Sequence, residues 1–395
     1  MTRRVLLIGA SVRAAAQSAR RAGLEPWCLD LFADADLSAI APVQAIAPAD
    51  YPQGFLELLA AGPLGPVIYT GGLENHPELI DAISDQRPVW GHLGPTLRRV
   101  RAPERLASVL REAGYATPAI RLEATGLPSD GTWLAKPRWG SGGHRIEPWQ
   151  GHPLAGQPGD WYWQERIVPP PGTELVPASA LFVADAQGQV TAVGWCRQLV
   201  GQSWLRAAPF AFCGCVGPFP VSTAACDLPR LGQVLGSAFG LRGLFGVDFL
   251  VIGSQAVVLE VNPRYPASTE VYERVWNLAL LRHHRAAFTG SAVEPTDELP
   301  QYKPSTRTSS AMTKAILFAA ADCVFRRAQL AGLTESDRSQ PVQLADLPPE
   351  GTSIAAGQPI LTVLAPTTDL AAATVSEIEC RLGSAPSFTS EWEPT

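Results

Sequence analysis

In the stretch VVLEVNPRYPASTE, residues 257–270, an acid, an amide and a guanidinium follow one another at intervals of two residues. The apolar residues of its first half predict a buried strand, and side chains two residues apart project from the same face of a strand. We therefore expect Glu260, Asn262 and Arg264 on one face. A structural ion pair would account for two of them, whereas all three together suggest a site.

A second carboxylate precedes this strand. Asp248 lies in the apolar stretch GVDFLVI, and Gly253 and Ser254 predict a turn that pairs the two strands as a hairpin. Two facing carboxylates and the Asn262 amide are oxygen ligands that suit Mg²⁺, which usually shares its coordination with substrate phosphates. The alternative is a buried acid pair held by Arg264 alone, which would raise one pKa and reduce stability. We prefer the metal site.

Two further segments fit phosphate and nucleotide chemistry. In LAKPRWGSGGHRI, Lys136 ends a predicted strand and the turn of residues 140–143 lets backbone amides approach a phosphate. This turn does not have the GxxxxGK[ST] spacing of a Walker loop. The strand WQERIV ends in Gln164 and Glu165, which offer groups to an adenine edge and to ribose hydroxyls. Neither segment is specific when taken alone.

Together these segments resemble the ATP-grasp superfamily over roughly residues 1–290, most specifically at the pattern D-x11-E-V-N-P-R. The resemblance implies ATP held between two antiparallel lobes, with two Mg²⁺ or, as a second option, Mn²⁺. It implies that Lys136 contacts the α- and β-phosphates and that Arg264 acts on the transferred phosphoryl group or the acyl-phosphate, these two being the catalytic residues. The other implied contacts are the lid of Gly140, Ser141, Gly142 and Gly143, the nucleotide pocket of Gln164, Glu165 and Ile167, and the metal ligands Asp248, Glu260 and Asn262.

The sequence departs from the family pattern in three places. A lysine expected at the start of the first lobe's helix is absent, and Arg101 or Arg105 would have to replace it; Arg105 is counted here among the nucleotide contacts. Asp248 stands where many members have Glu. The segment PPPGTELVP after Ile167 is longer than usual.

The elements around these motifs predict an α/β and α+β chain. In residues 1–100, strands alternate with helices, which predicts a doubly wound parallel sheet whose carboxyl-end rim binds ligands. Residues 101–290 predict a two-lobed ATP-grasp domain, and residues 291–395 a small β-rich extension with a closing helix, after a Pro-rich boundary at 295–310. Substrate contacts are expected on the rim and after the metal strand, at Ser11, Gly72, Glu74, Asn75, Ser268 and Glu270, with Glu270 orienting an amine.

Composition excludes several classes of protein. The chain of 395 residues is 46% apolar with a net charge of −6, which argues against nucleic acid as the main partner. We find no apolar stretch of the roughly 18 residues that cross a membrane, and no signal peptide is expected. Seven scattered cysteines suggest no disulfide framework, so a reducing cytoplasm is expected, and Cys213 and Cys215 are expected to be small strand residues.

Lysine is rare in the chain. Only Lys136, Lys303 and Lys314 are lysines among 31 basic residues. Lys314, in AMTK, lies one place too late for a biotin attachment site. His283 and His284 are expected on the surface of an arginine-rich helix.

The implied activity is ATP-dependent joining of a small carboxylate to an amine through an acyl-phosphate. The alternatives are a bicarbonate-activating carboxylase and a nucleotide-binding sensor without ligase activity. A dinucleotide oxidoreductase is weaker still, because GASVRA lacks the glycine fingerprint. The sequence does not identify the acid, the amine or the role of residues 291–395, and a homodimer is expected only because relatives of this fold often form one.

Overall fold

A four-stranded parallel sheet begins the computed structural model, which describes residues 3–157, 159–291, 293, 299, 311–330 and 342–381. The strand order is β3-β2-β1-β4, with β1 at Arg4–Gly9, β2 at Glu25–Asp30, β3 at Val43–Ala45 and β4 at Val67–Tyr69. Val5 and Leu7 pack with helix α1 (Arg13–Arg21), whereas Leu6 and Ile8 pack with α3 (Phe55–Ala61) and α4 (Pro77–Gln86). Both faces of β1 are covered, so the predicted doubly wound arrangement is confirmed.

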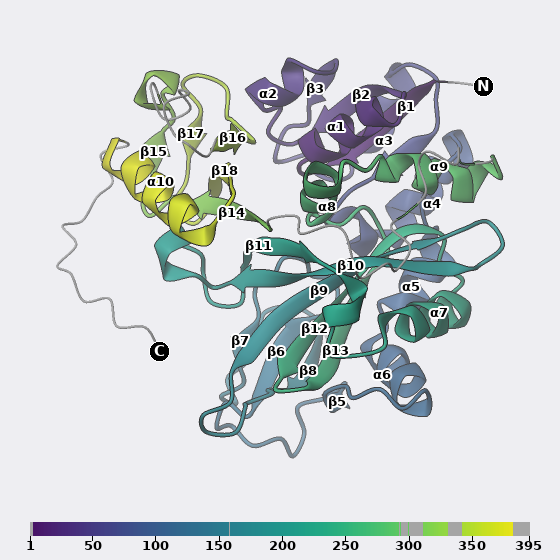
Figure 1. Cartoon of the computed structure of the whole chain (residues 1–395), viewed down its shortest axis with the longest axis vertical. Helices are drawn as coiled ribbons and strands as arrows, with labels where there is room; N and C mark the ends of the chain where they lie inside the picture. Colours follow the sequence, from purple (N-terminus) through teal and green to yellow (C-terminus); the bar gives the residue numbers. More distant parts are fainter. Residues whose placement is uncertain are drawn as a thin grey trace.

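The largest sheet has eight strands in the order β13-β12-β9-β10-β11-β14-β18-β16 (Figure 1). The predicted hairpins are present, as β9 (Leu175–Ala184) with β10 (Val190–Val200) and as β12 (Gly243–Ile252) with β13 (Gln255–Asn262). Helix α7 (Leu228–Phe239) packs on its apolar face, with Phe182 and Phe245 stacked at 5.1 Å beneath it. β11 (Phe212–Phe219) carries Cys213 and Cys215, which are buried and free, as expected of small strand residues.

The C-terminal extension continues this same sheet. Its strands β14 (Met312–Phe318), β18 (Pro359–Ala365) and β16 (Gln343–Ala345) follow β11, and α10 (Thr368–Arg381) packs on them. The short strands β15 (Cys323–Val324) and β17 (Ser353–Ile354) pair beside them. Except for Leu299, the expected boundary at 295–310 lies outside the described residues.

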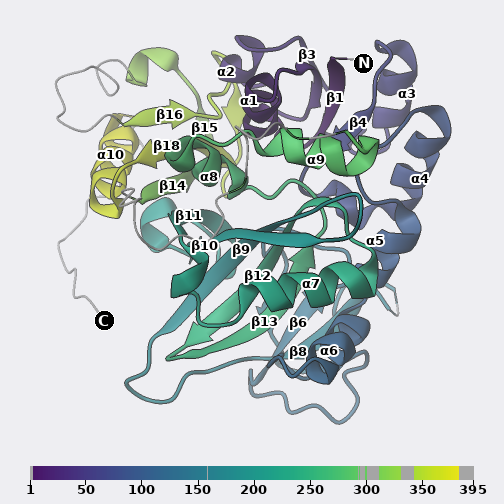
Figure 2. The same ribbon diagram turned by 45° about the vertical axis from the view of Figure 1, so that its right-hand side comes forward.

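The N-terminal and C-terminal regions lie side by side, as Figures 1 and 2 both show. The Ala35 amide of α2 (Ala35–Ser38) donates to the Leu347 carbonyl at 2.7 Å, and the Leu347 amide donates to Asp36 Oδ1 at 2.9 Å. Helices α8 (Thr269–Trp276) and α9 (Leu280–Thr289) pack against α1 between the parallel sheet and the large sheet. Residues far apart in the sequence therefore meet close to β13.

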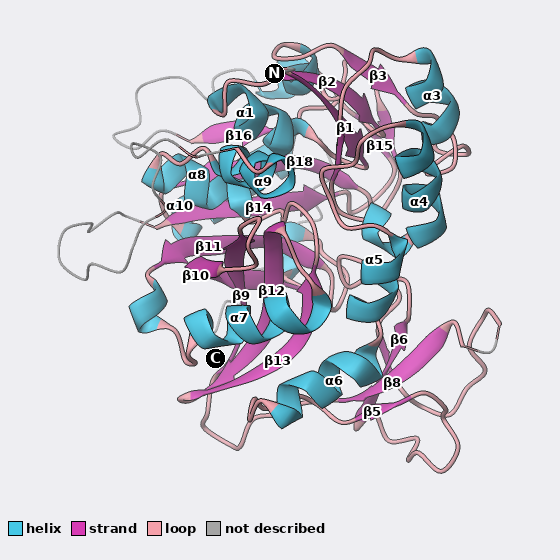
Figure 3. Ribbon diagram, turned by 90° about the vertical axis from the view of Figure 1, so that its right-hand side faces the viewer, coloured by secondary structure: helices cyan, strands magenta, loops and turns pink. Residues whose placement is uncertain are grey.

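A smaller antiparallel sheet completes the two-lobed region (Figure 3). Its order is β5-β8-β6-β7, with β5 at Ile120–Arg121, β6 at Trp133–Pro137, β7 at Glu147–Pro148 and β8 at Trp161–Glu165. A small core of Ala135, Trp149 and Trp161 holds it together, and α6 (Pro103–Glu112) lies between it and the large sheet. The predicted pair of antiparallel lobes is confirmed.

One expectation about histidine is wrong. His284 on α9 is only 2% exposed, because its ring joins the N-terminal region to β12. Its Nδ1 accepts from the Leu244 amide and its Nε2 lies 2.9 Å from the Trp90 carbonyl oxygen. In the part of the chain that the structure describes, no helix is long and apolar enough to cross a membrane.

Candidate active site

A cavity of about 660 Å³ opens between the small sheet and the large sheet. It is lined by most of the residues that the sequence motifs singled out, although these come from segments more than a hundred residues apart. Those on its wall are Lys136, Gly140, Ser141, Gly142, Gly143, Gln164, Ile167, Asp248, Glu260, Asn262, Arg264 and Ser268.

The two carboxylates of the predicted metal site face each other across the β12–β13 hairpin, where Asp248 is the register partner of Glu260. Asp248 accepts hydrogen bonds from the side chains of Gln198 and Asn262, both at 3.0 Å. Burial and the neighbouring Glu260 raise the pKa of Asp248 to about 7. Burial opposes ionisation of Glu260 too, but Arg101 and Lys136 together lower its pKa. The pair therefore carries less negative charge than two free carboxylates until a cation joins it.

This donor set fits Mg²⁺. Two carboxylates and an amide oxygen are hard ligands, and Mg²⁺ commonly takes its remaining ligands from water and nucleotide phosphates. Among the described residues, no group of three or more His, Cys, Asp or Glu side chains is arranged to hold a metal ion. A magnesium ion at Asp248, Glu260 and Asn262 would therefore depend on the nucleotide for part of its coordination.

Arg264 is held from both sides. Its Nε donates to Glu74 Oε1 of the N-terminal region at 3.0 Å, and its Nη2 donates to Asn262 Oδ1 at 3.2 Å. A Cβ on Gly71 would lie 3.3 Å from the guanidinium carbon, so a glycine there lets the arginine pack closely. The N-terminal region thus fixes the guanidinium beside the acid pair.

Lys136 projects into the cavity from β6. Its ammonium donates to Gln164 Oε1 at 3.2 Å and lies 5.7 Å from the centre of the Tyr162 ring. Burial alone would lower its pKa, but Tyr162 and Glu260 raise the pKa overall, so the lysine stays protonated. A compact cation at this point suits the phosphate chain of a nucleotide.

The glycine-rich loop 140–143 is closed against the large sheet. The Phe212 amide donates to the Gly142 carbonyl at 2.9 Å, and the Arg101 guanidinium donates to the Gly140 carbonyl. Gly143 has a φ of 78°, and a Cβ there would overlap the Phe210 carbonyl oxygen. Only glycine permits this approach of the two backbones.

Arg101, and not Arg105, reaches the site. Arg105 is exposed on α6 and lies outside the cavity wall. The Arg101 side chain is 7% exposed, and its guanidinium lies 3.6 Å from Glu260 Oε2 and 3.1 Å from Asn75 Oδ1. The sequence predicted that one of these two arginines replaces the missing lysine, but the residues around them did not show which one.

Several other predicted residues do not line the cavity. Glu165 is exposed and accepts from the Ala119 amide at 3.0 Å, and Ser11 is also exposed. Gly72 lies at the end of the N-terminal sheet, while Glu74 and Asn75 reach the site only through Arg264 and Arg101. Glu270 is buried behind the wall, with its carboxylate bound by Arg13, Arg274 and Lys314. Each carboxylate oxygen already accepts two hydrogen bonds, so neither is left to accept one from a substrate amine. Sequence analysis missed Arg13 and Gln198 because no motif marks them.

Residues 104–268 match the family model of the ATP-grasp domain. The chain carries an ATP-grasp domain. Among solved structures, it resembles a Rhizobium etli pyruvate carboxylase with a TM-score of 0.67 and 14% identity, covering 92% of this chain and 35% of that one. It resembles the N5-carboxyaminoimidazole ribonucleotide synthetase of Thermus thermophilus with a TM-score of 0.63 and 15% identity, covering 98% and 100%.

A third similar structure is the Campylobacter jejuni biotin carboxylase, with a TM-score of 0.65 and 13% identity, covering 92% of this chain and 87% of that one. At these identities the likeness concerns the fold. No curated protein sequence matches the chain. The similarity of fold therefore extends over nearly the whole chain, beyond the residues 104–268 that the family model matches.

Proposed function

We propose that the protein is an ADP-forming ligase that joins a small carboxylate to an amine, using ATP and Mg²⁺. The observation that carries the proposal is the single cavity in which the Asp248–Glu260 pair, Lys136 and Arg264 meet under a closed glycine-rich loop. Each of these groups suits a triphosphate or the charge that develops on its γ-phosphoryl group.

The reaction has two steps. A carboxylate oxygen of the substrate attacks the γ-phosphorus of ATP, the bond to the β-phosphate oxygen breaks, and ADP and an acyl-phosphate result. The amine then attacks the acyl carbon, the acyl–oxygen bond to phosphate breaks, and the amine loses a proton as inorganic phosphate leaves. Neither step needs a nucleophile from the protein.

The side chains of the cavity provide charge and position. Mg²⁺, held by Asp248, Glu260 and Asn262, would supply neutralisation of phosphate oxygens. Lys136 binds the phosphate chain, and Arg264, fixed by Glu74, holds the transferred phosphoryl group beside the substrate. The closed loop 140–143 excludes water, which would otherwise hydrolyse the acyl-phosphate.

A bicarbonate-activating carboxylase is the second candidate. Carboxylases stand among the proteins of similar fold, and one of these structures, from Hydrogenobacter thermophilus, holds MgADP and bicarbonate. In that reaction bicarbonate takes the place of the organic carboxylate and carboxyphosphate the place of the acyl-phosphate. For either activity we expect a cytoplasmic location, small-molecule partners and a homodimer.

The test is ADP release by the purified protein with ATP and Mg²⁺ against a panel of carboxylates, with hydroxylamine as the trapping amine. We expect one class of carboxylate to stimulate ADP release and to yield a matching hydroxamate. Glu260→Ala should abolish both, since it removes half of the acid pair, whereas Glu57→Ala, at an exposed position of α3, should not. Stimulation by bicarbonate alone would favour the carboxylase, and ATP binding without turnover for any acid would contradict both activities.

A further inference from the structure

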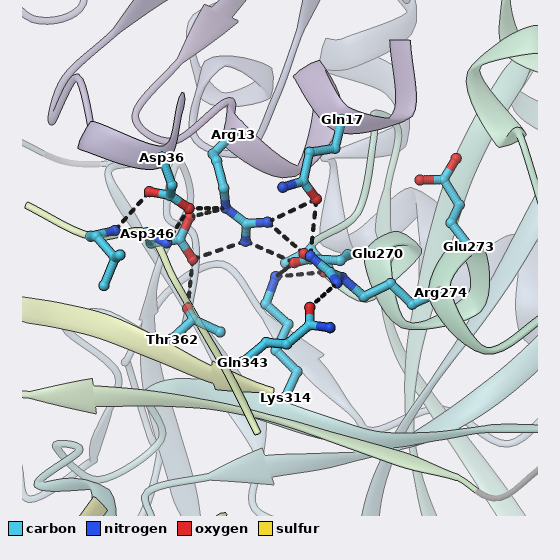
Figure 4. Close-up of polar contacts among 12 residues, drawn as sticks. Arg13, Gln17, Asp36, Glu270, Glu273, Arg274, Lys314, Gln343, Asp346 and Thr362 are labelled. Atoms are coloured by element: carbon cyan, nitrogen blue, oxygen red, sulfur yellow. Dashed lines mark hydrogen bonds and ion pairs between the residues drawn. The ribbon is translucent and has the colours of Figure 1, made fainter. Parts of the chain in front are cut away.

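Figure 4 shows a buried ionic cluster centred on Glu270, which lies two residues after Ser268 of the cavity wall. At its centre the Glu270 carboxylate, with no exposed surface, accepts hydrogen bonds from three cations. Arg13 binds both of its oxygens, at 2.5 and 2.8 Å, and Arg274 and Lys314 each approach to 2.9 Å. The three cations come from α1, α8 and β14, so three separate regions of the chain meet on one carboxylate.

A second carboxylate extends the cluster into the C-terminal region. Asp346 accepts from Arg13 Nε at 2.8 Å and from the Thr362 hydroxyl at 2.6 Å, and Asp36 lies 3.5 Å from the same Arg13 Nε. We call Arg13, Asp36, Glu270, Arg274, Lys314 and Asp346 the Glu270 cluster. Its three cationic and three anionic side chains balance in charge.

Lys314 connects the cluster to the cavity. Its ammonium donates to Glu270 Oε2 and also to the Ala267 carbonyl oxygen, at 2.9 and 3.2 Å. Pro266, Ala267 and Ser268 line the cavity. They lie between Arg264, two residues past the end of β13, and α8, which begins at Thr269. The segment 264–270 is therefore fixed at both ends: Arg264 at its N-terminal end bonds to Glu74, and Glu270 at its C-terminal end belongs to the Glu270 cluster.

A purely stabilising role explains this arrangement poorly. Buried ion pairs contribute little net stability compared with apolar residues of the same volume, because both charges lose their hydration. Lys314 lies within MTKAILF, a strand whose other described side chains are apolar except for Thr313. It is one of three lysines in a chain whose positive charge is otherwise arginine, and Lys136, another of them, projects into the cavity. An ammonium is small enough to reach a carboxylate and a wall carbonyl together.

We propose that Lys314 and Arg13 are positioning residues of the carboxylate-activating reaction. By fixing Glu270 and the Ala267 carbonyl, they hold the wall of Pro266, Ala267 and Ser268 at a set distance from Arg264, so that the substrate carboxylate lies in line with the γ-phosphate. The C-terminal region thus takes part in catalysis through Lys314. This inference rests on the proposed function.

The kinetic consequence is specific to the carboxylate. Lys314→Met keeps the unbranched chain up to the position of the ammonium, but it releases the Ala267 carbonyl and leaves Glu270 with two cations. A small displacement of a bound reactant can cost about 10- to 100-fold in rate. We therefore expect kcat/KM for the carboxylate to fall at least 10-fold in Lys314→Met, while the dissociation constant of a fluorescent ATP analogue changes less than twofold.

The matched control is Glu379→Gln. It removes one charge from an ion pair of the same C-terminal region, in which Arg206 Nε lies 2.6 Å from Glu379 Oε1, away from the cavity wall. We expect this variant to change thermal stability but not kcat/KM for the carboxylate. If Lys314→Met does not fold, Arg13→Lys provides the test, because it keeps the charge and loses the two-pronged contact; at least a threefold loss in kcat/KM for the carboxylate is expected.

Each outcome decides the matter. The inference is overturned if folded Lys314→Met keeps its kcat/KM for the carboxylate, if it loses ATP-analogue affinity to the same degree, or if Glu379→Gln behaves identically. It is also overturned if Arg13→Lys, used in its place, shows no loss. A wild-type protein without carboxylate-dependent ADP release rejects the proposed function and this inference with it, whereas an active wild type with an equally active Lys314→Met rejects this inference alone.

Discussion

Arg101 shows how a single side chain can take the place of a missing motif residue. It is the first residue of the predicted second domain, and it contacts the Gly140 carbonyl, Asn75 and Glu260 at once. Its guanidinium therefore joins the N-terminal region, the loop and the acid pair. A lysine at this place could supply the charge, but its ammonium is a single compact group, whereas the planar guanidinium reaches these partners with separate nitrogens.

Replacing Arg101 should weaken nucleotide binding. We expect Arg101→Met to raise the dissociation constant of an ATP analogue at least 10-fold, since the variant loses a cation from the cavity and the contact that holds the loop closed. Arg105→Met is the matched control, because Arg105 is exposed outside the cavity wall, and its affinity should stay within twofold. Fluorescence titration measures both constants. Equal losses in the two variants would contradict the assignment of Arg101.

The residues that sequence analysis found are those whose partners are close in the chain. Asp248 and Glu260 are twelve positions apart on one hairpin, so strand periodicity and a glycine turn sufficed to place them together. Arg13 and Glu270 are 257 positions apart, and Glu270 consequently seemed to be a substrate contact when it is a buried anchor. The sequence could not show which of Arg101 and Arg105 reaches the site. Arg101 precedes the amphipathic helix α6 and Arg105 lies in its first turn, and only tertiary packing decides which side chain points inward.

At the scale of elements, we propose that the glycine-rich loop 140–143 is the part of the site that moves. Its backbone touches β11 through the Gly142 carbonyl, and Gly143 lies so close to Phe210 that no side chain fits. Gly142, with a φ of 63°, has no atom within 4 Å of the position that a Cβ would take. Alanine substitutions at these two glycines therefore distinguish the effect of backbone strain, which both would have, from the effect of disturbed loop closure, which only the one at Gly143 would have.

We predict that Gly143→Ala will impair turnover much more than Gly142→Ala. Both replacements place alanine at a positive φ, which costs about 1 kcal/mol, but only Gly143→Ala also collides with the Phe210 carbonyl. We expect kcat/KM for ATP to fall roughly 10- to 100-fold in Gly143→Ala, as expected when closure is disturbed, and a few-fold in Gly142→Ala. Steady-state kinetics of ADP release measures both. A similar modest loss in the two variants would mean that the loop does not close against Phe210 during turnover.

At the scale of the whole molecule, two buried histidines join the N-terminal region to the large sheet. His92 lies 2.9 Å from the Pro263 carbonyl and accepts from the Arg242 amide, while His284 bridges Trp90 and Leu244. Burial lowers the pKa of each to about 4. Each ring is therefore neutral, donating from one nitrogen and accepting at the other.

The neutral state of His284 predicts a loss of stability in acid. The pKa is about 6.5 in the unfolded chain and about 4 in the folded one. Between these values the unfolded state binds the proton and the folded state does not, so the free energy of unfolding falls as the pH drops from 6.5 towards 4. The full effect is about 3 kcal/mol for one histidine, and above pH 6.5 the group contributes no pH dependence.

Denaturant unfolding of wild type and His284→Gln between pH 7.5 and 4.5 measures this effect. The variant should be less stable at pH 7.5, because Gln reproduces the two hydrogen bonds imperfectly, but its stability should fall less steeply below pH 6.5. Asp34 shifts in the opposite direction, its pKa raised to about 8 by burial and by Asp346, and this contribution cancels in the difference between the two proteins. Parallel pH profiles would show that His284 is not the group responsible.

Closure of the glycine-rich loop would also order in time the events of the proposed catalytic cycle. In this structure the loop is bound to Arg101 at one end and to Phe212 at the other. We infer that a nucleotide enters or leaves while both contacts are broken, and Arg101 is itself paired with Glu260 of the acid pair. Under the proposed function, departure of ADP is thereby tied to the charge of Asp248 and Glu260, so the protein would keep its spent nucleotide until the anionic products beside those carboxylates have left.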